Sequence, residues 1–178
     1  KIGDGAFMDC RFSSIKIPHS VIQLDGNPFA GCMDLEEIDV SENPHFVYVD
    51  GVLTDSEMEW IYWCAPSKSG DYSIPSTVNT ICNGAFYGSS LSSIAIPDSV
   101  YHIGDKAFAY CESLKSITIP GKLKVMGINL LAYCGKLSEI RIVGESLNFK
   151  VVDDVLFNKD MTRLVLCSCE KSGTYVIP

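Results

Sequence analysis

The sequence is poor in basic residues and in long apolar runs, and both shortages exclude classes of protein. It carries 14 Lys and Arg against 22 Asp and Glu, which gives a formal net charge of −8. Nucleic acids and anionic lipids attract clustered Lys and Arg, so this acidic chain is expected to bind no nucleic acid and no anionic lipid. No apolar stretch reaches the ~18 residues that a membrane-spanning helix needs, and we therefore expect no direct membrane insertion of this segment.

Motifs for catalysis, cofactors and metals are also missing. The sequence contains no H-E-x-x-H, no G-x-S-x-G and no glycine-rich phosphate loop. Neither Asp50-Gly51 nor Asp153-Asp154 is followed by the alternating oxygen ligands of a calcium loop. Cys167-Ser168-Cys169 has the wrong spacing for a zinc site. We therefore expect a protein that is not an enzyme and that holds neither a cofactor nor a metal.

What the sequence has in abundance is internal repetition. Ile2 to Pro18, Ile81 to Pro97 and Ile103 to Pro120 each open on an apolar residue, continue through an Ala-Phe pair and close on I-x-I-P. The second apolar residue of the closing pattern recurs at Ile17, Val40, Ile74, Ile96, Ile119, Ile142 and Ile177, in steps of 23, 34, 22, 23, 23 and 35 residues. A period in the low twenties is typical of a leucine-rich-type solenoid, in which each repeat forms one coil.

The two long steps contain insertions that are related to each other. Phe46–Leu53 matches Phe149–Leu156, and the match continues to Ile74 and Ile177 at a constant offset of 103 residues. Turn residues between apolar runs predict a β-hairpin in each insertion. We expect a single domain over residues 1–178, with hairpin-containing long repeats near 43–75 and 148–178. Because solenoids need polar caps and this sequence begins and ends inside repeats, we expect it to be a fragment of a longer array.

These motifs resemble the BspA-type leucine-rich repeats, a bacterial family. The resemblance is carried by I-G-x-x-A-F-x-x-C, by L-x-x-I-x-I-P and by the V-D-G-V-L of the first insertion, and it covers nearly the whole chain. It implies an α/β leucine-rich repeat solenoid. It also implies adhesion to host or matrix proteins.

Each coil is expected to contain two local elements. The I-x-I segment alternates with period two and predicts a short strand. Stacked at one strand per coil, these segments predict a curved parallel β-sheet on the concave side of the solenoid. The Ala-Phe segment predicts a short helical turn whose aromatic side chain points inward, at Phe7, Phe29, Phe86 and Phe108.

Outward-facing residues of the predicted strands form the first candidate binding surface, since the concave sheet of a solenoid is commonly used for binding. The side chains that we expect to contact a protein or glycan are Lys16, Glu37, Asp39, Asp71, Thr118, Glu139 and Arg141. The second candidate is an exposed aromatic patch of Trp60 and Tyr62, which alternation in the insertion places opposite Ile61 and Trp63. The alternative is that these two rings pack on a neighbouring repeat or on the rest of a longer protein.

Four of the eight cysteines, Cys10, Cys32, Cys111 and Cys134, share one position of the repeat. Stacked coils lie ~4.8 Å apart, a spacing that permits a disulfide. Equivalent side chains in a stack run parallel, however, whereas the two sulfurs of a disulfide turn toward each other. We therefore favour buried free thiols over disulfides.

Three functions are compatible with these expectations. The first, which we favour, is a non-catalytic protein-interaction or adhesion module of a secreted or cell-surface bacterial protein, located outside the cell. The second is a structural spacer that projects another domain. The third is a substrate-recruiting accessory region of a larger surface protein.

Overall fold

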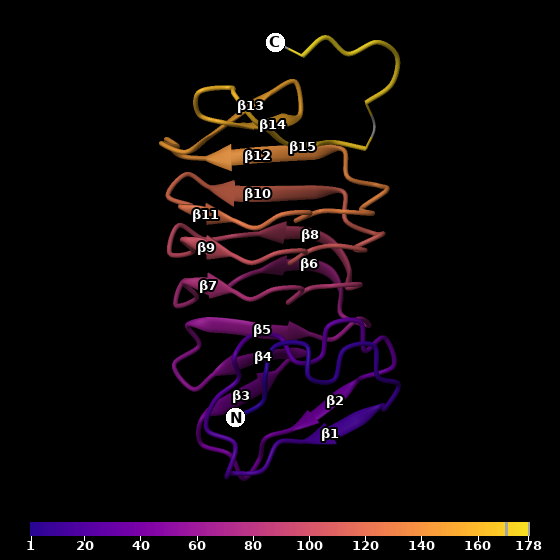
Figure 1. Cartoon of the computed structure of the whole chain (residues 1–178), viewed down its shortest axis with the longest axis vertical. Coiled ribbons are helices and arrows are strands. Elements are labelled where there is room, and N and C mark those ends of the chain that lie inside the picture. The colour runs from indigo at the N-terminus through magenta and orange to yellow at the C-terminus, as the bar shows by residue number, and fades with distance from the viewer. Residues whose placement is uncertain (170, 178) are drawn as a thin grey trace.

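The computed structural model describes residues 1–169 and 171–177, and these residues form about six stacked coils of β-structure. Coils 1 and 2 carry β1 and β2, coil 3 carries β3 to β6, and coils 4, 5 and 6 carry β7–β8, β9–β10 and β11–β12. Strands β13 to β15 follow coil 6. The N-terminus lies near one end of the stack and the C-terminus at the other (Figure 1). The solenoid predicted from the repeat period is therefore confirmed.

The I-x-I segments form parallel strands, as their alternation predicts. Four of them make one sheet, in the order β12 (Glu139–Val143), β10 (Ser116–Pro120), β8 (Ser90–Ala95) and β6 (Ser69–Ser73). The register aligns Ile94, Ile117 and Ile140 across three coils, and all three side chains are buried. Each strand therefore turns its paired apolar residues into the solenoid and the residues between them outward.

Coils 1 and 2 contribute a separate pair of parallel strands. Strand β1 (Ser14–Lys16) pairs with β2 (Glu37–Asp39), with Ile15 beside Ile38. Neither strand pairs with β6 within the described residues. The continuous sheet expected from the repeat is thus divided in two at coil 3.

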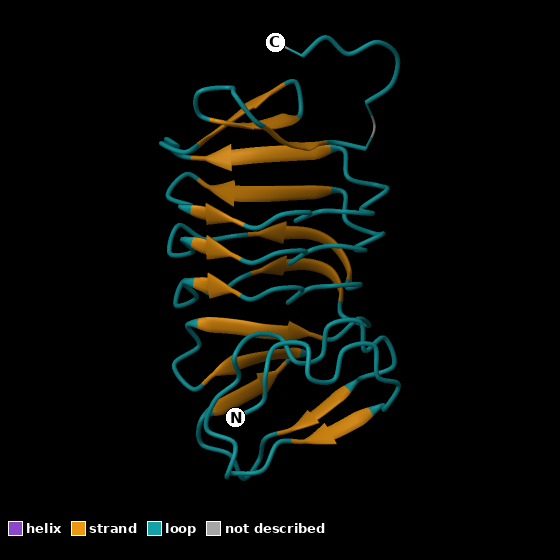
Figure 2. Cartoon of the chain, viewed as in Figure 1, coloured by secondary structure: helices purple, strands orange, loops and turns teal. Residues whose placement is uncertain are grey.

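A second parallel ladder runs in the opposite direction to the first (Figure 2). It is built from the short strands β7 (Thr80–Ile81), β9 (His102–Ile103) and β11 (Val125–Met126), one from each of coils 4 to 6. Their inward residues Ile81 and Ile103 are fully buried. Each of these coils therefore has a strand in both ladders, with the core between them.

The two insertions form antiparallel units of three strands, one strand more than a hairpin. The first contains β3 (Phe46–Val49), β4 (Val52–Asp55) and β5 (Trp60–Cys64), and the second contains β13 (Phe149–Val152), β14 (Val155–Asn158) and β15 (Leu164–Cys167). In the first unit β5 also pairs in parallel with β7. The insertion therefore adds its strands to the second ladder.

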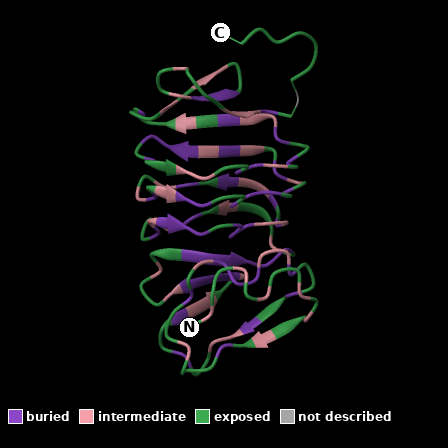
Figure 3. Cartoon of the chain, viewed as in Figure 1, coloured by how far each residue is buried: buried purple, intermediate pink, exposed green. Residues whose placement is uncertain are grey.

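The core is a column of aromatic rings from the Ala-Phe segments. Phe7 stacks on Phe29 at a centroid distance of 5.7 Å, and Phe86 stacks on Phe108 at 5.2 Å. Trp63 of β5 lies 6.2 Å from Phe29 and fills the column where coil 3 has no Ala-Phe segment. Figure 3 shows buried residues in every coil of the stack. Burial of one such ring stabilises the fold by ~1.5–3 kcal/mol.

The prediction of short helical turns at the Ala-Phe segments is wrong, since the described residues contain no helix (Figure 2). A helix would use each N–H group for a bond to the carbonyl four residues back. Here the N–H groups of Gly5, Phe7 and Asp9 donate to carbonyl groups of coil 2, and those of Ala6 and Met8 donate to the carbonyl three residues back. Bonding between coils therefore replaces bonding along a helix.

The predicted strand at the end of the chain is also wrong. Thr174, Val176 and Ile177 are exposed and belong to no strand. Pro178, which completes the expected I-x-I-P, lies outside the described residues. Within the described residues, no further coil pairs with this segment to order it as a strand.

Coil 3 thickens the stack on one side only. On the side of the second ladder it supplies three strands, where coils 4 to 6 supply one each. On the side of the Ala-Phe segments it supplies only the short link between β5 and β6, and coil 2 contacts coil 4 directly, with Asn27 Nδ2 donating to the Gly84 carbonyl at 2.8 Å. In Figure 1, β1 and β2 accordingly slant relative to β10 and β12.

Candidate functional site

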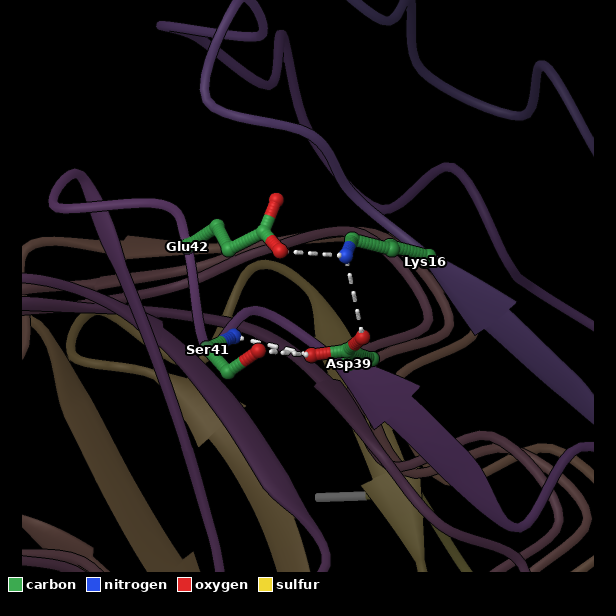
Figure 4. Close-up of polar contacts among 4 residues, drawn as sticks. All are labelled: Lys16, Asp39, Ser41 and Glu42. Carbon is green, nitrogen blue, oxygen red and sulfur yellow. Dashed lines mark hydrogen bonds and ion pairs between the residues drawn. The ribbon is translucent and has the colours of Figure 1, made fainter.

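The outer face of β1 and β2 carries a small network of ion pairs (Figure 4). Lys16 Nζ lies 2.9 Å from Glu42 Oε1 and 3.7 Å from Asp39 Oδ2. Asp39 Oδ1 also accepts hydrogen bonds from the Ser41 hydroxyl at 2.6 Å and from the Ser41 N–H at 2.9 Å. The Ser41 donors hold the pKa of Asp39 below its usual range, and Glu42 raises the pKa of Lys16. Sequence reasoning missed Ser41 and Glu42, because they follow the strand in a turn.

Glu37 lies beside this network and is less constrained. It pairs in register with Ser14, is exposed, and forms no side-chain hydrogen bond or ion pair with the described residues. A free carboxylate next to an organised cluster is available to an external partner. Glu37 is therefore the predicted contact residue that can be changed with least effect on the fold.

The four remaining predicted residues of the sheet face lie on the sheet of β6, β8, β10 and β12. Asp71 Oδ1 accepts hydrogen bonds from the hydroxyls of Ser93 at 2.7 Å and Ser92 at 2.9 Å, which lower its pKa. Thr118 pairs in register with Arg141 on the neighbouring strand, and Arg141 forms an ion pair with Glu139. The seven residues therefore form two polar groups, one on each side of the break between β2 and β6.

The predicted aromatic patch is wrong for one of its two residues. Trp60 is 41% exposed, but Tyr62 is only 7% exposed and packs against Phe46 at a centroid distance of 6.0 Å. Both faces of β5 are covered at this point, so alternation along the strand does not expose the second ring. Burial raises the pKa of Tyr62 accordingly. Tyr62 therefore packs inside its own insertion, against Phe46 of β3.

A different aromatic cluster was missed by sequence reasoning. Tyr87, Tyr110 and Tyr133 stack on the outside of coils 4, 5 and 6, with centroid distances of 4.9 Å and 4.5 Å. The sequence did carry a signal, since Tyr110 and Tyr133 occupy one repeat position, immediately before the Cys. We call these three residues the tyrosine ridge.

The cysteines are free thiols, as expected, and three of those at the shared repeat position are fully buried. The thiol of Cys32 donates to the Phe7 carbonyl at 2.9 Å, and the thiol of Cys134 donates to the Phe108 carbonyl at 3.0 Å. Burial raises the pKa of Cys32. Cys32 and Cys134 therefore link neighbouring coils, and the raised pKa of Cys32 makes its thiol a poor nucleophile.

No group of three or more His, Cys, Asp and Glu side chains in the described part of the chain is placed to hold a metal ion. No helix among the residues that the structure describes has the length and apolar character needed to cross a membrane.

Comparison with known families agrees with the repeat pattern and the fold. The sequence matches the BspA type leucine rich repeat region in six copies, over residues 1–49 and 62–174. The chain therefore belongs to the BspA-type leucine-rich repeat family. Among curated proteins, none matches this sequence.

Solved structures of bacterial leucine-rich repeat proteins share the architecture. A leucine-rich repeat protein from Eubacterium ventriosum is 28% identical over 75% of this chain, with a TM-score of 0.68. The pneumococcal vaccine antigen PcpA (22% identity, 83% of this chain, TM-score 0.67) and a leucine rich cell surface protein from Faecalibacterium prausnitzii (21%, 81%, 0.56) share the fold. The matches cover 37%, 43% and 51% of those three chains, so this chain corresponds to about half of each or less.

Proposed function

We propose that this chain is a non-catalytic protein-interaction module of a secreted or cell-surface protein, and that it binds through the polar face of its parallel strands. The observation that carries the proposal is the arrangement of charged side chains on that face, above a predominantly apolar core. An extended row of polar groups on a rigid sheet can contact a broad protein surface without ordering loops.

The family supports an interaction role over a catalytic one, because its repeats generally serve as non-enzymatic scaffolds. Location outside the cell is supported by two relatives of the same fold, one described as a cell surface protein and the other as a vaccine antigen. Adhesion to a host or matrix protein is the specific role that we propose. A spacer or a substrate-recruiting region of a larger surface protein is the alternative.

The test uses Glu37→Lys, which reverses a charge on the sheet face without breaking a bond described above. The probes are immobilised fibronectin and laminin, and binding of the wild-type chain and the variant is measured by biolayer interferometry. We expect the variant to lose binding to the probe that the wild type recognises, by about tenfold for a contact of ~1.4 kcal/mol. Glu145→Lys, at an exposed residue outside the strands, is the matched control.

Two results would contradict the proposal. Binding that is equal for wild type and Glu37→Lys would remove the sheet face of β1 and β2 as the contact surface. Failure of the wild-type chain to bind either probe would count against matrix adhesion and favour the spacer. Thermal unfolding of each variant, measured in parallel, ensures that a loss of binding is not a loss of the fold.

A further inference from the structure

The tyrosine ridge is the largest exposed aromatic feature on the outside of the solenoid. Tyr110 is 39% exposed and Tyr133 is 70% exposed, while Tyr87 is half-buried at the other end of the stack. The ridge follows the Ala-Phe side of coils 4 to 6 and not the polar sheet face. It is therefore separate from the surface assigned to the proposed function.

The backbone beneath the ridge is unfavourable for tyrosine. Tyr110 and Tyr133 have φ angles of 61° and 62°, in the left-handed region. At the same repeat position coils 2 and 4 carry Gly31 and Gly88, with φ angles of 76° and 72°. A bulky residue in this region is strained, and here it contributes nothing to the core. Strain at exposed rings that pack only on one another, outside the core, points to contact with something outside the chain.

The surface is hollowed on both sides of the ridge. On one side lie two adjoining hollows of about 380 Å³ and about 480 Å³, and both are lined by Tyr110, Glu112 and Ser113. On the other side a hollow of about 460 Å³ is lined in part by Tyr87, Met8 and Ile128. A partner chain that crosses the ridge can therefore place side chains into a hollow on either side.

Negative charge predominates around these hollows. Their acidic lining residues are Asp4, Asp9, Asp105 and Glu112, and their basic lining residues are Lys106 and Lys136. The whole chain has a formal net charge of −8. The electrostatic complement of this surface is a cationic group.

We propose that the tyrosine ridge binds a basic, extended segment of a partner protein. Lys and Arg have the required shape, because their aliphatic stems can lie along the tyrosine rings while their charged heads reach the carboxylates beside them. Arg can also stack on the outer face of Tyr133, the most exposed ring. The three rings are separated by two intervals of ~4.8 Å, about 10 Å in all, a length that about three extended residues match at ~3.3 Å per residue.

The geometry favours a peptide over a glycan. A sugar stacks on the open face of an aromatic ring, whereas the rings of Tyr110 and Tyr133 stack on each other with an interplanar angle of 23°. Only ring edges, hydroxyl groups and the outermost face are left for a ligand. Tyrosine edges and hydroxyls in a rigid row are typical of surfaces that bind proteins.

The test uses two fluorescein-labelled octapeptides, one alternating Arg with Gly and the other alternating Glu with Gly. Their binding to this chain is measured by fluorescence anisotropy. The variant is Tyr110→Gly combined with Tyr133→Gly, which leaves the net charge unchanged and gives coils 5 and 6 the residue that coils 2 and 4 already use. Because glycine is favourable at these φ angles, we expect the variant to remain folded, with a melting temperature within a few degrees of the wild type.

We expect the Arg peptide to bind the wild type and the Glu peptide not to bind. The double variant should bind the Arg peptide with an affinity at least about tenfold lower, as expected for loss of an aromatic hot spot. Glu112→Gln should also lower the affinity for the Arg peptide. Glu37→Lys should leave it unchanged, which separates this site from the sheet face. Equal binding by the double variant would show a general attraction to an acidic protein and would overturn the proposal. So would binding of maltohexaose, a neutral oligosaccharide, in place of the Arg peptide.

Discussion

Single cysteine side chains join neighbouring coils. The thiol of Cys111 donates to the Phe86 carbonyl at 3.1 Å, and the Ser89 hydroxyl lies 3.3 Å from its sulfur. Ser89 occupies the repeat position that Cys111 occupies one coil later. Cys32, Cys111 and Cys134 each donate from this position to a carbonyl of the preceding coil, and Ser89 shows that the position also accommodates a serine.

The hydrogen bonds of the Cys111 thiol predict a difference between two substitutions. Cys111→Ser keeps a donor at this position. Cys111→Ala removes it and leaves the buried Ser89 hydroxyl without its described partner, while the Phe86 carbonyl keeps its bond from the Ser89 N–H. An unsatisfied buried polar group costs ~1–3 kcal/mol, so we expect Cys111→Ala to be less stable than Cys111→Ser in urea unfolding. If the alanine variant were the more stable of the two, the thiol would act only by filling space.

The strained backbone at Tyr110 and Tyr133 leaves a signal in the sequence that the repeat analysis did not use. Tyr110 and Tyr133 recur at one repeat position, but the glycines at that position in coils 2 and 4 are what reveal its left-handed backbone. Comparing residue types within one repeat position would have identified both tyrosines as unusual. Their stacking with Tyr87, from the adjacent repeat position, could not be read in the same way, because it depends on side-chain direction.

At the level of elements, the contact between coils 2 and 4 depends on one buried amide. Asn27 is fully buried, accepts a hydrogen bond from the Phe29 N–H at 2.9 Å and donates to the Gly84 carbonyl at 2.8 Å. It replaces the backbone bonds that join the Ala-Phe segments of coils 4 and 5, such as that from the Phe86 N–H to the Ala107 carbonyl. Asn27 therefore joins two segments that are not consecutive in the repeat.

We predict that Asn27→Ala destabilises the fold by ~2–4 kcal/mol. It leaves the buried Phe29 N–H without an acceptor, at a cost of ~1–3 kcal/mol, and removes one of the two hydrogen bonds to the Gly84 carbonyl, which keeps its bond from the Tyr87 N–H. Urea unfolding followed by fluorescence measures the change. The control is Asn83→Ala, because Asn83 also bonds across coils, to Asp4 at 3.1 Å, but is exposed to water. A loss for Asn27→Ala no greater than for the control would mean that the two coils do not depend on this amide.

Much of the fold could be predicted from the sequence, because its repeat is carried by local pattern. The I-x-I segments fixed the strands and their register, and the 103-residue offset located both insertions. The Ala-Phe segment could not be assigned in the same way. The residues of this segment are compatible both with a short helix and with a series of turns. Backbone hydrogen bonds to the next coil, which the local sequence does not show, select the turns. The prediction that Tyr62 is exposed was wrong for a related reason, because Phe46, which covers its ring, lies on another strand.

The strand period predicted which residues of the candidate site face outward, but not how those residues are grouped on the surface. Lys16, Asp39 and Asp71 face outward as the strand period indicates. That Lys16 and Asp71 lie in separate groups follows from the break between β2 and β6, which is a consequence of how the insertion packs. No pattern within one repeat contains that information.

For the whole molecule, two thiols and one phenol with raised pKa values predict a loss of folding stability at alkaline pH. Burial raises the pKa of Cys64, Cys82 and Tyr72 to about 12 in the folded chain. In the unfolded chain a thiol ionises near ~8.5 and a phenol near ~10. The unfolded state therefore loses these protons first, so stability is fully present below pH ~8.5 and falls as the pH rises toward ~12.

Melting temperatures measured from pH 7 to pH 12 test this expectation. They should be constant up to pH ~8.5 and then fall. Tyr72→Phe removes one of the three groups, so the fall should begin at the same pH but be less steep above pH ~10. A melting temperature that stays constant to pH 12 would mean that the three side chains are not buried as described.

The added thickness of coil 3 has a consequence for the course of the stack. Two extra strands on the side of the second ladder add ~10 Å of length there, and the Ala-Phe side gains none. The axis of the solenoid therefore bends at coil 3, toward the Ala-Phe side. The same insertion recurs 103 residues later. Repetition of this unit would bend a longer chain at regular intervals into a superhelix, and the polar faces of successive straight sections would point in different directions. Several partners could then be held around one such filament at fixed angles.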